Sequence, residues 1–324
     1  MRTPSSTWKI IRHTLAWLMG ACAWVPILPA AAPKQKSPPL QPILRDRSEV
    51  AAVLARAPRP TPAEMARPLT IVLVADQKDH LADIRAHHYP LWQERWARLL
   101  GGSAAWGRGP VNLCPENEAP AVDAPGAPGV RVLKAQQWPA PEQFAAAHVV
   151  VAFCYIAWTP ARLSEIQQYL ARGGGYVAIH SATWTKPKAS AEVAAVVGVG
   201  GFQFFRHGVI KLRIDRPDHP ICAGLPLEIE LRDETYWPPT PDPTLAGFTV
   251  LASSPERITP KDEAAKHQPI YWTAQPGAGR LFGCVLGHFT WSFDDPLFRI
   301  LLLRGIGWAA GANPYRLDSL VTVP

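Results

Sequence analysis

Five polar residues in short segments of this 324-residue chain have side chains that could carry out chemistry together. His180 ends the apolar run of GGGYVAIHSATW, His80 lies in VADQKDH, and His288 lies in VLGHFTW. The other two are His207 in FFRHG and Glu234 in LRDETYW. Imidazoles and a carboxylate brought to one place suit proton transfer or the binding of a divalent metal ion.

No local sequence motif assembles these residues into a metal site. HExxH and similar zinc spacings are absent, so the fold would have to bring the ligands together. A metal-free acid–base site with His180, Glu234 and His288 as catalytic residues is therefore the preferred hypothesis. Because neutral imidazole is a common zinc ligand, a zinc ion held by His80, His180 and His288 is the alternative. Tight NAD binding is not expected, since GxGxxG is missing after the first predicted strand.

Apolar strands alternate with amphipathic helices from Leu69 onward. LTIVLVAD, VRVLKA, HVVVAFCY and YVAIH are typical of buried strands, whereas PLWQERWARLLGG and TPARLSEIQQYLARGGG are typical of helices. This alternation predicts an α/β fold with a mostly parallel central sheet that helices cover on both faces. The second half adds short strand-like runs, and the chain then forms a helix, LFRILLLRGIGWAAG, whose apolar residues nearly encircle it.

The predicted sheet would bring these polar residues together at one edge. Ligands of open parallel sheets bind beyond the carboxyl ends of the strands, where His80, His180 and His288 follow their strands. The structural alternative for His180 is a buried histidine bonded to a backbone carbonyl. For Glu234, a buried carboxylate needs a partner, and an ion pair with a neighbouring arginine is the alternative to a catalytic role.

The first 32 residues are typical of a signal peptide. Basic residues precede the apolar run TLAWLMGACAWVPIL, and PAAAP offers small residues for cleavage. An uncleaved anchor and a lipid attached to Cys22 are the alternatives, but the apolar run is short for a membrane span and contains Pro26. We expect an exported protein, periplasmic or extracellular, with no membrane span after cleavage.

Composition indicates the domain boundaries. Residues 33–67 are rich in proline and basic residues, which predicts an extended linker in which SEVAAVLARA favours a short helix packed on the domain. One α/β domain is expected over residues 68–312, followed by a tail over residues 313–324. The net charge of +7 lies in the signal and the linker. Residues 68–324 therefore show no basic excess that would indicate nucleic-acid binding.

Four cysteines remain beyond the predicted signal, Cys114, Cys154, Cys222 and Cys284. An exported protein can form disulfides, but no pairing follows from their positions. Cys154 and Cys284 lie in apolar runs that are typical of inert buried thiols.

Several segments resemble the ThuA-like (trehalose utilisation) family over residues 68–311. They are KDHLADIRAHHYPLWQ, GGGYVAIHSA, FRHG, DHPI, DETYW and GRLFGCVLGHFTWSFDDPLFRILLLRGIGWAAG. The resemblance implies a flavodoxin-like three-layer sandwich related to class I glutamine amidotransferases. In those enzymes the strand-to-helix turn holds the catalytic cysteine, where this chain has His180. Because a histidine cannot form the glutamyl thioester, glutamine hydrolysis by that route is not expected.

The resemblance also implies recurring polar positions at His80, His180, Ser181, His207, His219, Glu234 and His288. We expect His219 to cap backbone groups in the PDHPI turn instead of binding a ligand. Aromatic side chains beside the polar residues suit stacking on sugar rings, although they also suit a protein core. The predicted substrate-binding residues are His80, His88, Ser181, Trp184, His207, Tyr236 and Trp291.

Two functions remain open at this point. The first is an exported enzyme that acts on a sugar or keto-sugar. The second is a non-catalytic module that binds a carbohydrate or a partner in the same pocket. The oligomeric state does not follow from the sequence.

Overall fold

The computed structural model describes residues 40–114, 121–258 and 262–323. The predicted signal peptide, Cys22 and the first residues of the predicted linker lie outside the described residues.

Five parallel strands form one half of a single sheet. Their order, β2-β1-β3-β4-β9, differs from their order in the chain. They have apolar runs without alternation because helices cover both faces of this half. Their bounds are Leu69–Ala75 (β1), Val130–Gln136 (β2), Val149–Ala152 (β3), Gly175–Ile179 (β4) and Arg280–Cys284 (β9).

Four antiparallel strands continue the same sheet from β9 in the order β8-β7-β5-β6. The α/β class is confirmed. The sheet is mixed, because the extra strands of the second half extend the parallel sheet and do not form a separate layer. Their bounds are Phe202–Ile214 (β5), Glu228–Pro239 (β6), Thr249–Glu256 (β7) and Lys266–Ala274 (β8).

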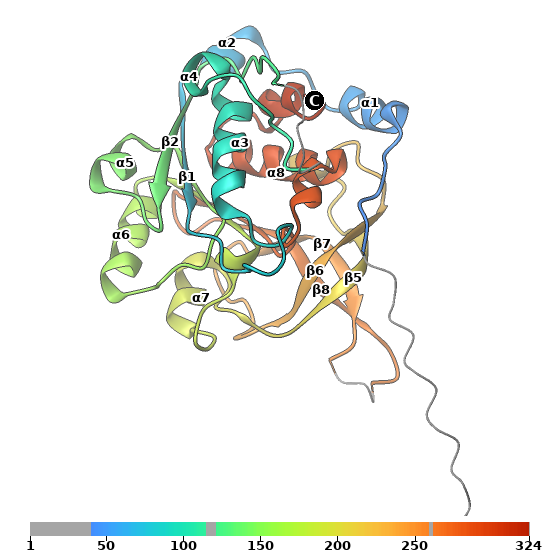
Figure 1. The fold of residues 1–324 in the computed structure, drawn as a ribbon. Helices are drawn as coiled ribbons and strands as arrows, with labels where there is room; N and C mark the ends of the chain where they lie inside the picture. The colour runs from blue at the N-terminus through green and yellow to red at the C-terminus, as the bar shows by residue number, and fades with distance from the viewer. Residues whose placement is uncertain (1–39, 115–120, 259–261, 324) are drawn as a thin grey trace, which may run out of the picture. The chain divides into compact units, whose positions relative to one another are not determined.

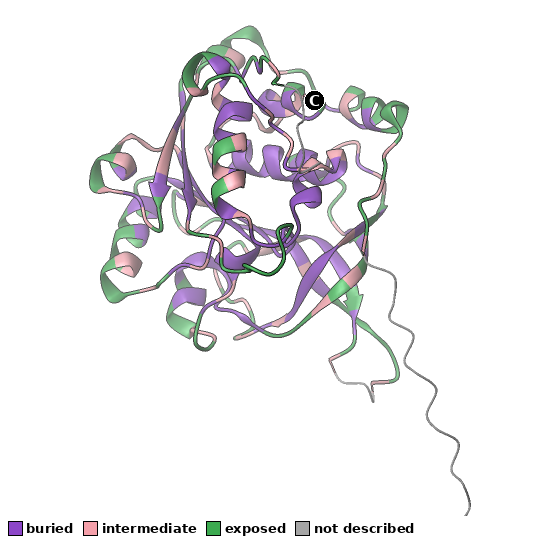
Figure 2. Ribbon diagram, viewed as in Figure 1, coloured by how far each residue is buried: buried purple, intermediate pink, exposed green. Residues whose placement is uncertain are grey.

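Helices α3 (Tyr89–Gly101) and α8 (Pro296–Ala309) lie on one side of β1 and β2, and α5 (Pro141–Ala146) and α6 (Pro160–Ala171) lie on the other (Figure 1). Figure 2 shows α8 buried around its whole circumference, whereas α6 has an exposed outer face. This burial agrees with the apolar residues that encircle α8. Its first turn is capped as the sequence predicts, since Asp295 accepts hydrogen bonds from the backbone of Leu297 and Phe298.

Shorter helices connect these elements. They are α4 (Ser103–Trp106), α7 (Ala191–Val197) and four 3-10 helices, η1 (His180–Thr183), η2 (Pro220–Cys222), η3 (Thr290–Asp294) and η4 (Pro314–Leu320).

The compact unit extends beyond the predicted domain at both ends and includes the described residues from 40 to 323. Part of the predicted linker forms α2 (Pro62–Ala66) and α1 (Arg47–Ala55), and α1, which buries Val50 and Val53, is the short packed helix predicted from SEVAAVLARA. The predicted tail contains η4, which is held to α8 by an ion pair between Arg304 and Asp318 at 2.8 Å. These segments are folded because their apolar residues are buried in the common core, which proline content and charge alone do not reveal.

Cys154, Cys222 and Cys284 are free and buried, as predicted for Cys154 and Cys284. In the part of the chain that the structure describes, no helix has the length and apolar character needed to cross a bilayer.

Candidate functional site

The sharp turn after β4 places His180 at the carboxyl edge of the sheet. His180 has a φ of 48°, in the left-handed region that side chains other than glycine seldom adopt. His87, in the loop before α3, has a φ of 47°. Strained backbone of this kind persists where the surrounding structure enforces it, and it is concentrated at functional sites.

Hydrogen bonds at Nδ1 determine the tautomers of the two buried imidazoles. His180 Nδ1 donates to the carbonyl oxygen of Val285 at 2.7 Å, and His87 Nδ1 donates to Asp79 Oδ1 at 2.8 Å. In a neutral ring the opposite nitrogen then carries a lone pair. The two Nε2 atoms lie 2.9 Å apart. Burial lowers the pKa of His87 to about 3, so a proton between these nitrogens is disfavoured.

Glu234 faces this pair from β6. Its Oε2 lies 3.3 Å from His180 Nε2 and 2.9 Å from His288 Nδ1. Burial would raise the pKa of Glu234, but the adjoining imidazoles of His180, His207 and His288 hold it well below its usual value. The carboxylate is therefore ionised and surrounded by imidazoles.

The antiparallel pairing of β5 and β6 sets the neighbours of Glu234. His207 is directly opposite Glu234 in the register, and its Nε2 lies 3.0 Å from Glu234 Oε1. Tyr236 is two residues along β6, which puts it on the same face of the strand. Its hydroxyl lies 2.7 Å from His180 Nε2 and 3.0 Å from Glu234 Oε2. His207 is half-exposed, so it lies where the cluster meets solvent.

One atom of each of His87, His180, Glu234 and His288 lies within 4.8 Å of the others, and all four residues are buried. We call these four residues the His3Glu cluster. Three imidazoles and one carboxylate within this distance are the donor set of a zinc site.

A buried carboxylate, Asp233, holds the loop that carries His288. It accepts hydrogen bonds from the backbone nitrogens of Gly287, His288 and Phe289 at 2.7, 3.0 and 3.4 Å. Gly287 has a φ of 126°, and a Cβ there would lie 3.2 Å from Ile179 and 3.4 Å from the Cβ of His180. The glycine therefore lets the loop approach the end of β4 closely.

Several predicted residues lie in or beside the cluster. Ser181 is buried, and its hydroxyl lies 2.8 Å from that of Tyr89, which also donates to Asp79. Trp184 contacts Tyr236 edge to face, with ring centroids 4.7 Å apart. The structure thus brings His180, Ser181, Trp184, His207, Glu234, Tyr236 and His288 together.

Three predicted residues have other surroundings. His80 is exposed and is not one of the four clustered ligands, although its ring lies 4.2 Å from that of His87. It belongs instead to a second group with Asp79 and His87. His88 accepts a hydrogen bond from the Leu91 backbone at 3.4 Å, which caps α3. Trp291 is buried, stacks on Phe289 and donates to the Arg232 carbonyl, so its face is not open to a ligand.

The structure also tests the structural roles considered for His219 and Glu234. His219 accepts a hydrogen bond from the Ile221 backbone, which is the capping role expected for it. Arg206 forms its ion pair with Glu256, at 2.7 Å, and not with Glu234. The partners of Glu234 are therefore the histidines.

Sequence reasoning missed His87 as a ligand. Nothing in the sequence RAHHYP distinguishes the clustered His87 from His88, which caps α3. Asp79 and Asp233, which position His87 and His288, were also missed, as was Tyr155, whose ring lies 5.9 Å from that of His87.

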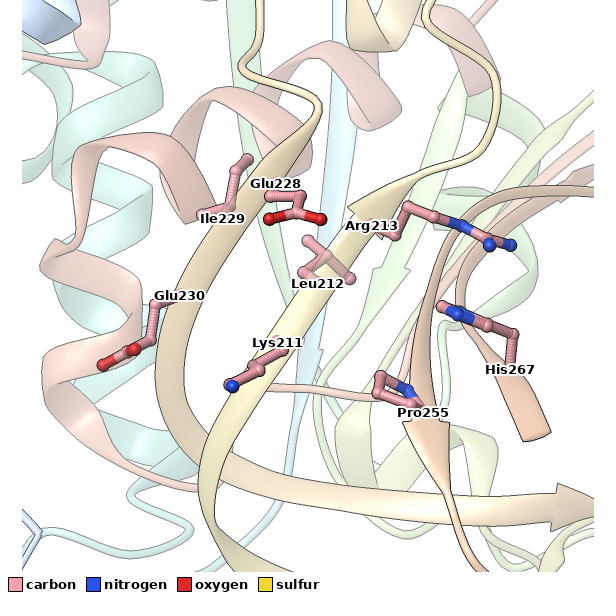
Figure 3. A pocket seen from close by; sticks show the side chains of 8 residues that line it. All are labelled: Lys211, Leu212, Arg213, Glu228, Ile229, Glu230, Pro255 and His267. Carbon is pink, nitrogen blue, oxygen red and sulfur yellow. The ribbon is translucent and has the colours of Figure 1, made fainter. Parts of the chain in front are cut away.

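A separate hollow of about 510 Å³ lies over β5 and β6 (Figure 3). Lys211 and Arg213 of β5 and Glu228 and Glu230 of β6 line it, and none of its lining residues belongs to the His3Glu cluster.

Comparison with known proteins identifies the family. A family profile described as ThuA, trehalose utilisation, matches residues 126–309, which is more than half of the chain. The chain belongs to the ThuA family. Most of the cluster, His180, Glu234 and His288, lies inside the matched region, whereas His87 precedes it. None of the curated proteins compared with the chain matches it.

Solved structures of ThuA-like proteins share the fold. One from Bacteroides uniformis is 18% identical, with a TM-score of 0.55 over 79% of this chain and 99% of its own. Another, from Parabacteroides merdae, is 18% identical, with a TM-score of 0.52 over 75% of this chain and 90% of its own. At this identity the likeness supports the fold of the ThuA family.

Proposed function

We propose that the His3Glu cluster binds a divalent metal ion, preferably zinc, and that the protein uses it to act on a sugar or keto-sugar. The observation that carries the proposal is the 2.9 Å separation of two Nε2 atoms whose rings both donate through Nδ1. Two lone pairs that face each other in a buried site repel, and a cation bound by both nitrogens would remove that repulsion.

The donor set fits zinc better than a calcium or magnesium ion. Three imidazole nitrogens and one carboxylate oxygen are typical zinc ligands, whereas calcium and magnesium prefer sites built from oxygen. The Asp79 carboxylate and the Val285 carbonyl hold the ligand rings from behind, as outer partners of metal-bound histidines do. His87 therefore takes the place that the sequence-based hypothesis gave to His80.

A metal-free acid–base site is the alternative. It would need a shared proton between His87 and His180, and burial opposes that extra charge. The zinc site and the metal-free site predict different metal contents of the purified protein, so metal analysis distinguishes them.

A bound divalent ion would polarise a carbonyl or hydroxyl oxygen of the substrate. The chain's own residues complete the site. The Tyr236 hydroxyl donates a hydrogen bond to Glu234 Oε2 and thereby orients the carboxylate. His207 is half-exposed beside Glu234 Oε1, where the cluster meets solvent. It is placed there to exchange a proton with a substrate hydroxyl.

The carbohydrate assignment rests on the description of the family and on aromatic side chains near the cluster. Trp184 and the exposed Phe205 have ring centroids 6.4 Å apart on the side of β5. Aromatic faces of this kind stack on the apolar faces of sugar rings. A non-catalytic module that binds the same ligands is the second candidate.

The first test combines metal analysis of the purified protein with binding and product analysis on a panel of disaccharides and their keto forms. We expect about one zinc ion per chain and conversion of at least one sugar. Binding without product formation would favour the binding module, and a chain that takes up no zinc would contradict the metal proposal.

Two further interpretations accompany this proposal. The order β2-β1-β3-β4-β9 of the parallel strands supports a flavodoxin-like arrangement, because that fold has its five strands in the order 2-1-3-4-5. The basic and apolar segments of residues 1–32 support export to the periplasm or the medium.

Export predicts a mature protein that begins near Pro33. Mass spectrometry of the protein recovered from the periplasm or medium checks this, since cleavage follows the small residues of PAAAP. An intact Met1 in the cytosolic fraction would contradict it, and a diacylated Cys22 would favour the lipid-anchored alternative.

A further inference from the structure

A hollow of about 440 Å³ lies between the start of α6 and the segment that joins η1 to α7. This volume is within the range of small-molecule sites. Its lining includes one half-buried aromatic side chain, Trp158, two lysines, Lys186 and Lys188, and the hydroxyl residues Thr185 and Ser190. An aromatic face with several hydroxyl groups is the composition that sugar-binding pockets use.

Lys186 connects this hollow with the His3Glu cluster. Its Nζ lies 3.4 Å from the centroid of the Tyr155 ring, and that ring lies 5.9 Å from the ring of His87. The lysine therefore reaches from the wall of the hollow to the edge of the cluster.

The charges of the hollow are unbalanced. Neither Lys186 nor Lys188 forms an ion pair with a carboxylate in residues 40–114, 121–258 or 262–323. Glu192 is the one acidic residue in its described lining. Two ammonium groups and one carboxylate leave a single net positive charge, which matches a ligand with one negative charge.

We infer that this hollow is a subsite for a sugar that bears a carboxylate group, and that Lys186 and Lys188 bind that carboxylate. The inference rests on the proposed function, since the reacting part of the same sugar lies at the His3Glu cluster. A carboxylate fits better than a phosphate because the hollow has one net positive charge, and because no arginine lines it to bind a phosphate through two hydrogen bonds.

The test measures binding of methyl glucuronide and of methyl glucoside, which differ in one carboxylate, by calorimetry at low salt. We expect the glucuronide to bind about tenfold more tightly, as a charge-assisted hydrogen bond to one lysine would provide. The preference should shrink as salt is added, because the lysines are exposed.

Lys186→Met and Lys188→Met variants test whether these lysines cause the preference for the glucuronide. Each should lower the affinity for the glucuronide severalfold and leave the affinity for the glucoside unchanged. The matched control is Lys211→Met, which removes an exposed lysine from the hollow of Figure 3 and should change neither affinity. An unchanged melting temperature verifies that each variant is folded.

Equal affinities for the two probes, or a preference that survives both lysine substitutions, would overturn the inference. So would glucose 6-phosphate binding more tightly than the glucuronide, because that result would assign the hollow to phosphate. Metal content is measured on the same samples. A chain without zinc that still prefers the glucuronide would overturn the proposed function and leave the subsite standing.

Discussion

If the His3Glu cluster binds zinc as proposed, the His87→Ala variant should lose the zinc and, with it, turnover of any sugar substrate. His87 contributes one of the four ligand atoms that lie within 4.8 Å of one another, and its ring is fully buried and already held by Asp79. Loss of an outer partner of a metal ligand typically costs 10- to 100-fold in affinity or activity, so loss of a ligand should cost at least about 100-fold. Elemental analysis of the purified variant measures the zinc directly.

Zinc loss should also lower the stability of the folded state. A ligand that binds only the folded protein stabilises it by about 2.7 kcal/mol at a free concentration 100 times its dissociation constant. The melting temperature of the unmodified protein should therefore fall when a chelator is added, and that of His87→Ala should not respond.

His88→Ala is the matched control for this prediction. It removes the neighbouring histidine, which caps α3 and contributes no atom to the cluster. We expect full zinc content and a loss of about 1 kcal/mol of stability from the missing cap. A His87→Ala variant that keeps one equivalent of zinc would show that the cluster is not the metal site.

The Asp233→Ala variant should destabilise the protein by about 3–5 kcal/mol, because several buried groups lose their partner at once. Asp233 is fully buried, and its carboxylate accepts from the backbone of Gly287, His288 and Phe289. Its removal leaves these N–H groups without a partner and releases the loop that positions His288. Chemical denaturation measures the loss of stability, and zinc affinity should fall about 10- to 100-fold with it.

Two further variants separate the hydrogen bonds of Asp233 from a general effect of substitution in β6. Glu230→Ala removes an exposed carboxylate from the same strand and should change stability by no more than about 0.5 kcal/mol. Asp233→Asn keeps an oxygen acceptor and should retain part of the stability. If Asp233→Ala were as stable as Glu230→Ala, the carboxylate would have no role in holding the loop.

Part of the site could be predicted because the sequence indicates where the strands end. His180 and His288 each follow an apolar run, and the carboxyl ends of neighbouring parallel strands meet at one edge of the sheet. The pairing of β4 with β9 places these two ends side by side. The cap of α8 and its complete burial were equally predictable, because they depend on residues within a few positions of each other.

The choice between His80 and His87 could not be made in this way. His80 follows β1 more closely in the sequence, so it was the natural ligand to predict. In the structure, the loop after β1 folds back, the backbone nitrogen of His87 bonds the carbonyl of His288, and Ala86 pairs with Phe289. These contacts join segments about 200 residues apart, and they turn the ring of His87 inward and leave His80 at the surface.

The sequence by itself determined the α/β class, the family resemblance and the edge of the sheet where His180, Glu234 and His288 would gather, since each depends on local periodicity or on a motif. Only the tertiary structure decided the fourth ligand, the tautomers set by Asp79 and the Val285 carbonyl, and the inclusion of α2 and of residues 313–323 in the folded unit. Those features depend on contacts between distant segments. Their energies come from buried hydrogen bonds and apolar surfaces that exist only after the chain has folded.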